Sequence, residues 1–284
     1  MGPPPVILFL ALSPSVDVTY EVDELVVGGI TRPRAITRVA GGKTLNAARV
    51  ARQLGADVRI IAALGGYPGD WIEAQVALTR IPLAADTRTC FAISDGATTS
   101  TDLYEPATPF TAAEWDAFAA AARAERPDWV AVSGSMPPGV GDLAGVLADL
   151  RAAGARVALD SSGAGLASLI GSADLVKVNR HEASELLGAD VTAAEACALL
   201  RERHGVDAVV TDGTAGGAAL VGGVSAVIPP PARRGAFPAG SGDAFLGALL
   251  TAVDGPLGEA LAVASDAAVR NALVPGQGIL SSRA

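Results

Sequence analysis

Residues Val157–Thr211 give the clearest indication of the fold class, with the sequence VALDSSGAGLASLIGSADLVKVNRHEASELLGADVTAAEACALLRERHGVDAVVT. It contains three short apolar runs of strand length, Val157–Asp160, Leu175–Val178 and Ala208–Thr211, separated by amphipathic stretches. Before the last run, Thr192-Ala-Ala-Glu195 forms a capping box, which marks the start of a helix. Strands that alternate with helices at this spacing predict a mostly parallel sheet covered by helices.

The same alternation extends toward the N-terminus. Val6–Leu10, Val58–Ala63 and Trp129–Ser133 are further apolar runs of strand length, and Thr111-Ala-Ala-Glu114 is a second capping box. We therefore predict an α/β fold with a mostly parallel central sheet and helices on both faces. Because no internal repeat or low-complexity linker is visible, residues 1–284 are interpreted as a single domain.

Two regions, Tyr20–Val39 and Leu83–Glu105, lack helical periodicity. The first contains the run Glu21–Val27, and the second reads as two or three β segments broken by Ser94-Asp95-Gly96. We predict that both form strands of a small subsidiary sheet, inserted into the main domain as segments of approximately residues 13–40 and 83–105.

The composition excludes several classes of protein. Half of the residues are hydrophobic, which excludes a disordered chain, and the net charge of −9 argues against a nucleic-acid partner. The apolar run Val6–Leu12 is too short to span a membrane, so no membrane partner is expected. The two cysteines, Cys90 and Cys197, have no metal or redox spacing, and a cytoplasmic location is the expectation.

The segment Phe237-Pro-Ala-Gly-Ser-Gly-Asp-Ala-Phe-Leu-Gly-Ala-Leu-Leu250 joins a Gly-Ser-Gly turn to an apolar helical stretch. Small residues let backbone N–H groups converge at a helix N-terminus, which favours an anion. Asp243 follows in the first turn, where it could also serve as an ordinary cap. A loop–helix junction without function is the alternative, and a dinucleotide fingerprint is excluded because Phe245 stands where Gly is required.

Two further segments contain the chain's only lysines, Lys43 and Lys177. Ala-Gly-Gly-Lys-Thr-Leu-Asn46 ends like a P-loop, but Thr37 stands where that motif needs Gly. Its Lys and Asn suit a sugar hydroxyl or a phosphate. In the second segment, Asn179 and Glu182 could bind Mg²⁺, or could simply cap a helix.

Taken together, these segments resemble the PfkB/ribokinase family of sugar kinases over nearly the whole chain. The resemblance rests on AGGKTLNAARVARQLGA and FPAGSGDAFLGALL at the two ends, with VSGSMPPG, LDSSG, KVNRHE and VTDGTAGG between them. It implies a ribokinase-like three-layer α/β/α fold with a small β-sheet lid. The chain is most similar to the branch that holds 1-phosphofructokinase and tagatose-6-phosphate kinase, from which Ser13, Thr44 and Cys90 depart.

The resemblance also implies a role for individual residues, with ATP and Mg²⁺ as cofactors. Asp243 would be the catalytic base and Gly240, Ser241 and Gly242 the anion hole, while Asn179 and Glu182 would hold Mg²⁺. Asp17, Gly42 and Asn46 would bind sugar hydroxyls, and Lys43 and Arg88 the phosphate of the sugar. Residues toward the nucleotide would be Lys177, Thr211, Gly213, Gly216 and Asn271.

The activity implied is phosphoryl transfer from ATP to a ketohexose monophosphate, with fructose 1-phosphate as the first choice. Tagatose 6-phosphate or fructose 6-phosphate is the second, and a nucleoside or ribose kinase of the same fold the third. A sugar-phosphate sensor without catalysis would be expected to lose the base or the anion hole, yet Asp243 and Gly240–Gly242 are present. A homodimer through the lid is expected from the family.

Overall fold

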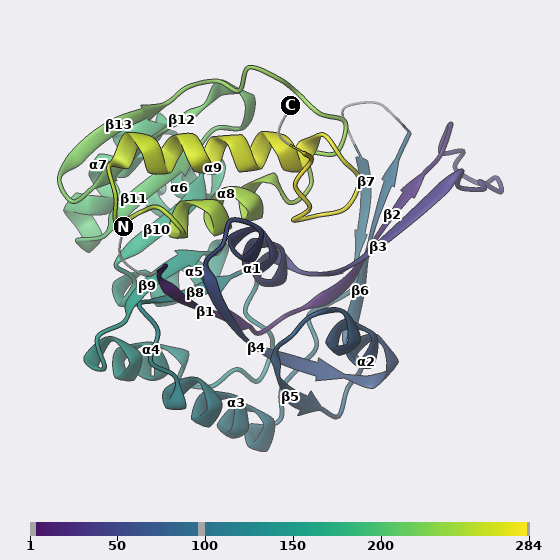
Figure 1. Cartoon of the computed structure of the whole chain (residues 1–284), viewed down its shortest axis with the longest axis horizontal. Helices are drawn as coiled ribbons and strands as arrows, with labels where there is room; N and C mark the ends of the chain where they lie inside the picture. Colours follow the sequence, from purple (N-terminus) through teal and green to yellow (C-terminus); the bar gives the residue numbers. More distant parts are fainter. Residues whose placement is uncertain (1–3, 96–99, 283–284) are drawn as a thin grey trace.

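The computed structural model describes residues 4–95 and 100–282 and contains two sheets (Figure 1). The large sheet has the strand order β13-β12-β11-β10-β9-β8-β1-β4-β5. All neighbours from β5 to β11 are parallel, and β12 and β13 are added antiparallel at one edge. Its strands are β1 (Val6–Ala11), β4 (Asp57–Gly65), β5 (Thr79–Leu83), β8 (Trp129–Ser133), β9 (Arg156–Asp160), β10 (Leu175–Asn179), β11 (Asp207–Thr211), β12 (Gly217–Val221) and β13 (Val224–Ile228).

Helices cover both faces of this sheet, so the predicted three-layer arrangement is confirmed. Successive side chains of a strand point to opposite faces. On β1, Phe9 therefore enters the core under α1, α2, α8 and α9, whereas Leu8 enters the core under α3 to α7. The helices are α1 (Lys43–Gln53), α2 (Gly66–Gln75), α3 (Ala112–Ala124), α4 (Leu143–Ala152), α5 (Gly163–Leu169), α6 (Arg180–Leu187), α7 (Ala193–His204), α8 (Ser241–Leu250) and α9 (Leu257–Ala272).

The predicted start signals of two of these helices are confirmed. Thr111 and Thr192 each accept a hydrogen bond from the backbone N–H three residues later, and the carboxylates of Glu114 and Glu195 each accept one from the threonine N–H. The six predicted strands also lie where the apolar runs placed them. Within the part of the chain that the structure describes, no helix is both long and apolar enough to cross a bilayer.

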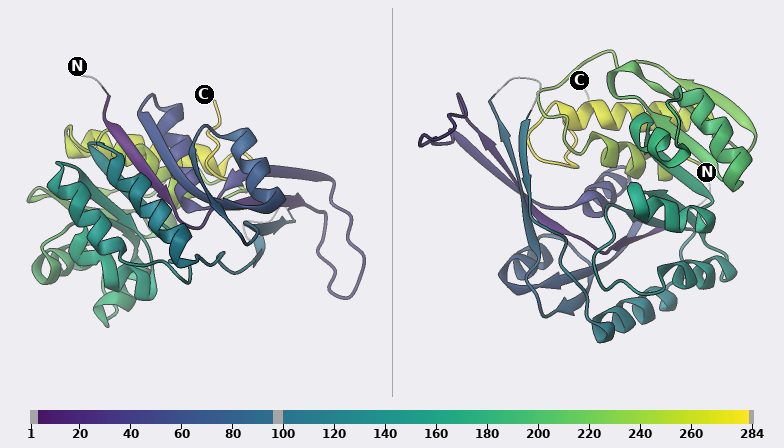
Figure 2. Two further views of the ribbon diagram at one scale, coloured as in Figure 1. Left: turned by 90° about the horizontal axis from the view of Figure 1, so that it is seen from below. Right: turned by 180° about the vertical axis from the view of Figure 1, so that it is seen from behind.

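The small sheet, which we call the lid, has the order β3-β2-β6-β7 and stands away from the layered body in both views of Figure 2. Its strands are β2 (Ser15–Glu21), β3 (Ala35–Gly41), β6 (Arg88–Ser94) and β7 (Ser100–Tyr104). The predicted break at Ser94-Asp95 is found, and Gly96 lies outside the described residues.

Two lid predictions were wrong in detail. The run Glu21–Val27 is not a strand, because β2 pairs with β3 along its full length and ends at Glu21. The chain beyond that point has no strand to pair with and forms a connection in which Val27 is 94% exposed. Leu83 also belongs elsewhere: it ends β5, which pairs with β4 in the large sheet.

Two helices approach each other with unusual closeness beneath the lid. Gly247 of α8 packs against the backbone of α1, and a Cβ at this position would lie 2.1 Å from the carbonyl oxygen of Ala47. Only glycine permits this contact. It brings Asn46, on the same turn of α1, against Asp243 at the start of α8.

Replacing Gly247 by Ala should therefore lower the melting temperature, because the added methyl group meets rigid backbone and the helices must separate. Overpacking of this kind typically costs about 1–3 kcal/mol of unfolding free energy. Gly258→Ala in α9 is the matched control: nothing lies within 4 Å of its added Cβ, so it should be neutral or stabilising. Equal thermal unfolding of the two variants would contradict the close contact.

Candidate active site

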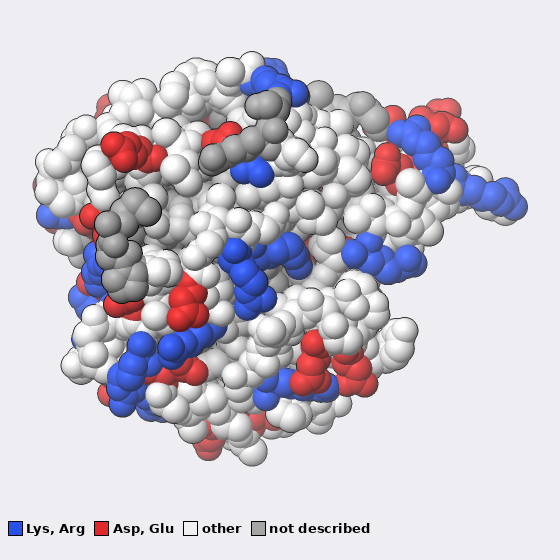
Figure 3. All heavy atoms as spheres, in the orientation of Figure 1, with Lys and Arg blue, Asp and Glu red and all other residues white. Residues whose placement is uncertain are grey.

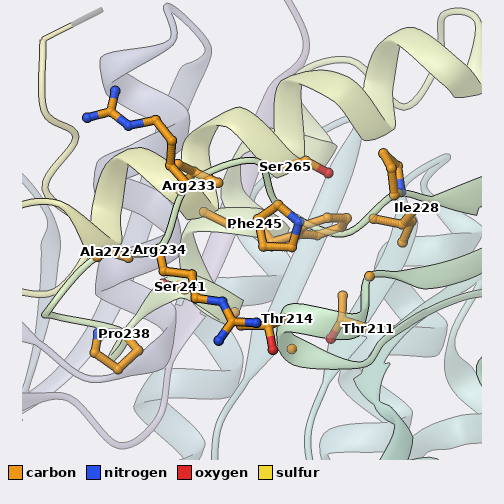
Figure 4. Close-up of a pocket in the computed structure, with 18 residues that line it drawn as sticks. Thr211, Thr214, Ile228, Arg233, Arg234, Pro238, Ser241, Phe245, Ser265 and Ala272 are labelled. Atoms are coloured by element: carbon orange, nitrogen blue, oxygen red, sulfur yellow. The ribbon is translucent and has the colours of Figure 1, made fainter. Parts of the chain in front are cut away.

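A cavity of about 480 Å³ lies between the C-terminal ends of β11 and β13 and the helices α8 and α9 (Figure 4). Ligands commonly bind at this edge of an open α/β sheet. One end is apolar, with Ile228, Phe245 and Val269 among its lining residues, and the other end is formed by the Ser241-Gly242 turn. Of the residues predicted to face the nucleotide, Thr211, Gly213 and Gly216 line this cavity, whereas Lys177 and Asn271 do not.

The turn before α8 requires glycine at position 240 and leaves backbone N–H groups available to an anion. Gly240 has φ 80°, the left-handed conformation that glycine adopts without strain. The Ser241 N–H donates to the Pro238 carbonyl at 3.1 Å, so this group is engaged and does not join an anion hole. The next N–H groups, of Gly242 and Asp243, meet no acceptor among the described residues. These two point along the positive end of the helix dipole.

Asn271 holds this turn in place from behind. Its side-chain amide donates to the Ala239 carbonyl at 2.9 Å and to the Ser241 hydroxyl at 3.2 Å, and its oxygen accepts from the Gly278 N–H. The residue is fully buried. Asn271 was expected among the residues toward the nucleotide; it does not line the cavity and instead supports the turn from behind.

Asp243 is buried at the junction of α8 and α1, where it is 6% exposed. Burial, reinforced by the negative charge of Asp160, raises the pKa of Asp243 to about 7, although Lys43, Asn46 and Lys177 oppose the shift. A carboxylate with such a pKa can accept and release a proton near neutral pH. The predicted position of Asp243 in the first helical turn is confirmed.

Asn46 is oriented so that it donates to Asp243. Its Nδ2 lies 3.1 Å from Asp243 Oδ2, and its Oδ1 accepts a hydrogen bond from Arg49 one turn later on α1. Arg49 is itself held by the Gln277 carbonyl. Because an arginine can only donate, it fixes the polarity of the amide, and the Asn46 NH₂ group must face the carboxylate. Sequence reasoning missed Arg49, although its position three residues after Asn46 places both on one helical face.

An ion cluster around the buried carboxylate of Asp160 lies beneath the Gly240–Gly242 turn, which we call the anion turn. Asp160, at the end of β9, is 1% exposed and accepts from Lys177 Nζ at 2.9 Å, while Lys43 Nζ lies 3.6 Å from its other oxygen. Burial alone would raise the pKa of Asp160, but the charges of Lys177 and Lys43 outweigh it and lower that pKa. A Cβ on Gly242 would lie 3.0 Å from Lys177 Nζ. Both lysine charges are thus held beside the turn.

The structure gives the two lysines ion-pair partners that the sequence interpretation did not include. Lys43 was assigned to the phosphate of the sugar, yet it lies between Asp160 and Glu182, with 3.9 Å to the latter. Lys177 was assigned to the nucleotide, yet it is buried under the turn. Asp160 was missed, because nothing in the segment LDSSG indicates that its carboxylate meets two distant lysines.

Asn179 and Glu182 form the helix cap that was the alternative to a metal site. Asn179 Oδ1 accepts from the Glu182 N–H, and Glu182 Oε2 accepts from the Asn179 N–H, both at 2.9 Å. Among the described residues, no group of three or more acidic, His or Cys side chains could hold a metal alone. However, Asp160 Oδ1 is buried without a hydrogen-bond partner. Mg²⁺ favours few carboxylates with water and phosphate oxygens, which fits this set.

The predicted sugar residues gather where the lid meets α1. Asp17, on β2, is buried and accepts from the Gly42 N–H at 3.1 Å and from the Ser15 hydroxyl. Arg88 donates to the Ser13 carbonyl at 3.2 Å. Its Nε and the Ser13 hydroxyl are both buried without partners among the described residues. Unsatisfied donors are costly in a protein interior, so a polar ligand is favoured here.

Of the family departures, Thr44 and Cys90 are accounted for within the fold. The Thr44 hydroxyl donates to the Ser133 carbonyl at 2.8 Å and is therefore engaged. Cys90 is buried on the lid strand next to β2, opposite Asp17, and burial raises the pKa of its thiol. Neither side chain needs a ligand to satisfy it.

Comparisons with known proteins give matches over most of the chain. The family model described as pfkB family carbohydrate kinase matches residues 11–282. A 1-phosphofructokinase of Rhodobacter capsulatus is 35% identical over 261 residues, covering 86% of this chain and 82% of that protein. Two solved structures of Escherichia coli phosphofructokinase-2, each 22% identical, share the fold. The complex with potassium has a TM-score of 0.89 and covers 98% of this chain and 96% of its own. The complex with fructose-6-phosphate has a TM-score of 0.86 and covers 94% and 93%.

The pKa of Asp243 makes the stability of the folded chain depend on pH. An ordinary aspartate has a pKa of 3.8, so the folded state binds this proton more tightly than the unfolded state does. The folded state gains the full stabilisation below pH 3.8, the ordinary pKa of aspartate. This stabilisation is lost as the pH rises through about 7, the pKa of Asp243 in the folded chain. Asp243→Asn cannot ionise, so its melting temperature should rise above that of the wild type progressively between pH 4 and pH 8.

Asp116→Asn, on the exposed side of α3, controls for the loss of a carboxylate elsewhere. Thermal unfolding followed by circular dichroism at several pH values measures both variants. A constant difference between Asp243→Asn and the wild type across this range would contradict the raised pKa.

Proposed function

Because this chain belongs to the pfkB family of carbohydrate kinases, we propose that it phosphorylates fructose 1-phosphate at the 6-hydroxyl, with ATP as donor. The single observation that carries the proposal is the position of Asp243. It is a buried carboxylate with a pKa of about 7, next to free N–H groups at the end of a nucleotide-sized cavity. The 35% identity with a 1-phosphofructokinase supports the choice of sugar.

In the proposed reaction, Asp243 accepts the proton of the attacking sugar hydroxyl. The sugar oxygen forms a bond to the γ-phosphorus, the bond to the β-phosphate oxygen breaks, and ADP leaves. Asn46 keeps one carboxylate oxygen of Asp243 occupied as an acceptor, so the other is available for the hydroxyl. The N–H groups of Gly242 and Asp243, with the helix dipole, stabilise negative charge on the transferring group.

The buried cluster would supply positive charge at the same point. Lys43 and Lys177 lie beside the turn, and Asp160 holds both in place. Asp160 and Glu182, through water, are the residues that would hold Mg²⁺. When bound, Mg²⁺ neutralises phosphate oxygens and fixes their orientation. Phosphoryl transfer needs such positioning and electrostatics more than covalent chemistry.

On the sugar side, Asp17 and the Gly42 backbone would bind hydroxyls, and the unpartnered Nε of Arg88 would bind the phosphate already present. Tagatose 6-phosphate and fructose 6-phosphate remain the second choice, since these sugars also carry a phosphate at one end and a free hydroxyl at the other. A ribose or nucleoside kinase would not need Arg88 in this role.

We also propose a homodimer formed through the lid. Ile36 and Leu103 are about half exposed, at 46% and 59%, on the sheet face that carries the stacked pair Tyr20 and Phe91. Exposed apolar surface of this kind is typical of interfaces. Sedimentation equilibrium should show a dimer that Leu103→Lys dissociates, and a wild-type monomer at micromolar concentration would contradict the proposal.

A cytoplasmic location remains the expectation. Both cysteines are free and buried, as in proteins of reducing compartments. Figure 3 shows acidic and basic side chains interspersed over the face it presents, without an extended basic surface among the residues drawn. This is consistent with a partner that is a small molecule and not a nucleic acid.

A panel of acceptors with coupled detection of ADP tests the sugar assignment. We expect strong turnover of at least one ketohexose monophosphate, with fructose 1-phosphate leading, and little turnover of fructose, ribose or a nucleoside. Arg88→Leu should raise KM for the phosphorylated sugar by tenfold or more, because a charge-assisted hydrogen bond to phosphate is lost. A preference of the wild type for an unphosphorylated acceptor, judged by kcat/KM, would overturn the assignment.

A further inference from the structure

The cavity between β11 and α9 is crossed on one side by the segment Pro229–Pro238, which the sequence motifs did not cover. It carries two adjacent arginines, Arg233 and Arg234, which are the cationic residues that border the cavity among those the structure describes. Both side chains are exposed, and neither forms a hydrogen bond or an ion pair with a described residue. Arg180, by contrast, is engaged: it pairs with Asp190 and with Asp212, next to the cavity residue Thr211.

The backbone around the two arginines is held on both sides. Three consecutive prolines, Pro229–Pro231, restrict the chain before them, since the proline ring fixes φ. After them, Gly235 packs against the end of α9 so closely that a Cβ would overlap the Ala272 carbonyl. The Phe237 N–H donates to the same carbonyl at 3.0 Å. The arginines are therefore presented from a defined place and not from a free loop.

The two side chains differ in direction. In Figure 4 the guanidinium of Arg234 extends toward Thr214 on the opposite wall, at the end of the cavity formed by Ser241. The guanidinium of Arg233 extends away from the cavity in the same view. Two neighbours of identical chemistry and similar exposure thus have different access to a bound ligand.

The two ends of the cavity differ in chemical character. The end near the C-terminus of β13 is lined by Phe245 and Ile228, with the Ser265 hydroxyl buried and unpartnered beside them. This end suits a flat apolar ring that carries a hydrogen-bond acceptor. The opposite end, at Ser241 and Gly242, has free N–H groups that suit phosphate oxygens. Arg234 reaches toward the phosphate end.

The side-chain charges beside the turn do not by themselves offset those of a nucleoside triphosphate. Beside the turn, Lys43 and Lys177 contribute two positive charges, against three carboxylates, those of Asp160, Glu182 and Asp243. A nucleoside triphosphate brings several additional negative charges to this place. Arginine is suited to phosphate because its planar fork donates two parallel hydrogen bonds.

We propose that Arg234 binds the polyphosphate of the nucleotide from the open side of the cavity and thereby selects nucleoside di- and triphosphates over the nucleoside. The inference rests on the proposed function, because it takes the cavity to be the nucleotide site. The Arg234 guanidinium extends across the end of the cavity formed by Ser241, so the polyphosphate is held between the N–H groups of the turn and one side chain. Arg233 has no part in this contact.

Calorimetric titration of ATP, ADP and adenosine into the wild type and three variants tests the proposal at constant Mg²⁺. Arg234→Ala should weaken binding of ATP and ADP by about tenfold or more, the usual effect of losing a charge-assisted hydrogen bond. Its affinity for adenosine should equal that of the wild type. Arg233→Ala should match the wild type for all three ligands. Arg234→Lys, which keeps the charge but not the fork, should lie between the wild type and Arg234→Ala.

Three results would overturn the role of Arg234 and leave the proposed function standing. They are an ATP affinity unchanged in Arg234→Ala, a loss of adenosine affinity in Arg234→Ala as large as its loss of ATP affinity, or an equal loss of ATP affinity in Arg233→Ala. Equal melting temperatures of the variants establish that folding is intact, as expected for exposed side chains. A wild-type chain that binds no adenine nucleotide would overturn the proposed function and this inference together. A chain that binds ATP but phosphorylates no sugar would overturn the function and leave Arg234 to be judged by the titrations.

Discussion

The close contact between Gly247 of α8 and the backbone of Ala47 on α1 is the constraint on which the site depends. The two helices come from opposite ends of the chain, and each begins at a glycine with positive φ, Gly42 or Gly240. Their approach seats Asn46 on Asp243 and closes that carboxylate off from water. A larger residue at position 247 would separate the sugar-binding part of the site from the base.

Exclusion of water from the site then shifts the pKa values of its two buried aspartates, Asp243 and Asp160. Burial raises the pKa of Asp243 to about 7, and the same dry surroundings strengthen the attraction between Asp160 and the two lysines. One buried carboxylate thus becomes able to take a proton, while its neighbour stays ionised and holds cations in position. Two neighbouring aspartates whose pKa values are shifted in opposite directions are typical of sites that separate a base from a charge-stabilising group.

The body of the fold and the location of the site could be predicted from the sequence, because apolar periodicity, capping boxes and glycine turns are local signals. The strand β2 was misplaced, since Ser15–Glu21 becomes a strand only by pairing with β3 and β6. Asp160 and Arg49 were missed because their importance lies in partners that the chain brings together only on folding. Lys177 was assigned to the nucleotide from its motif, whereas burial places it under the turn.

In the proposed reaction Asp243 takes the proton from the sugar hydroxyl, and single-turnover kinetics of Asp243→Asn measure this role. Asparagine keeps the shape of the side chain but cannot accept the proton, so the rate of the chemical step should fall by about 10²–10⁴-fold. Binding of ATP and of the sugar phosphate should stay close to that of the wild type. If Asp243→Asn retained more than about a tenth of the wild-type rate, with chemistry rate-limiting, Asp243 would not be the base.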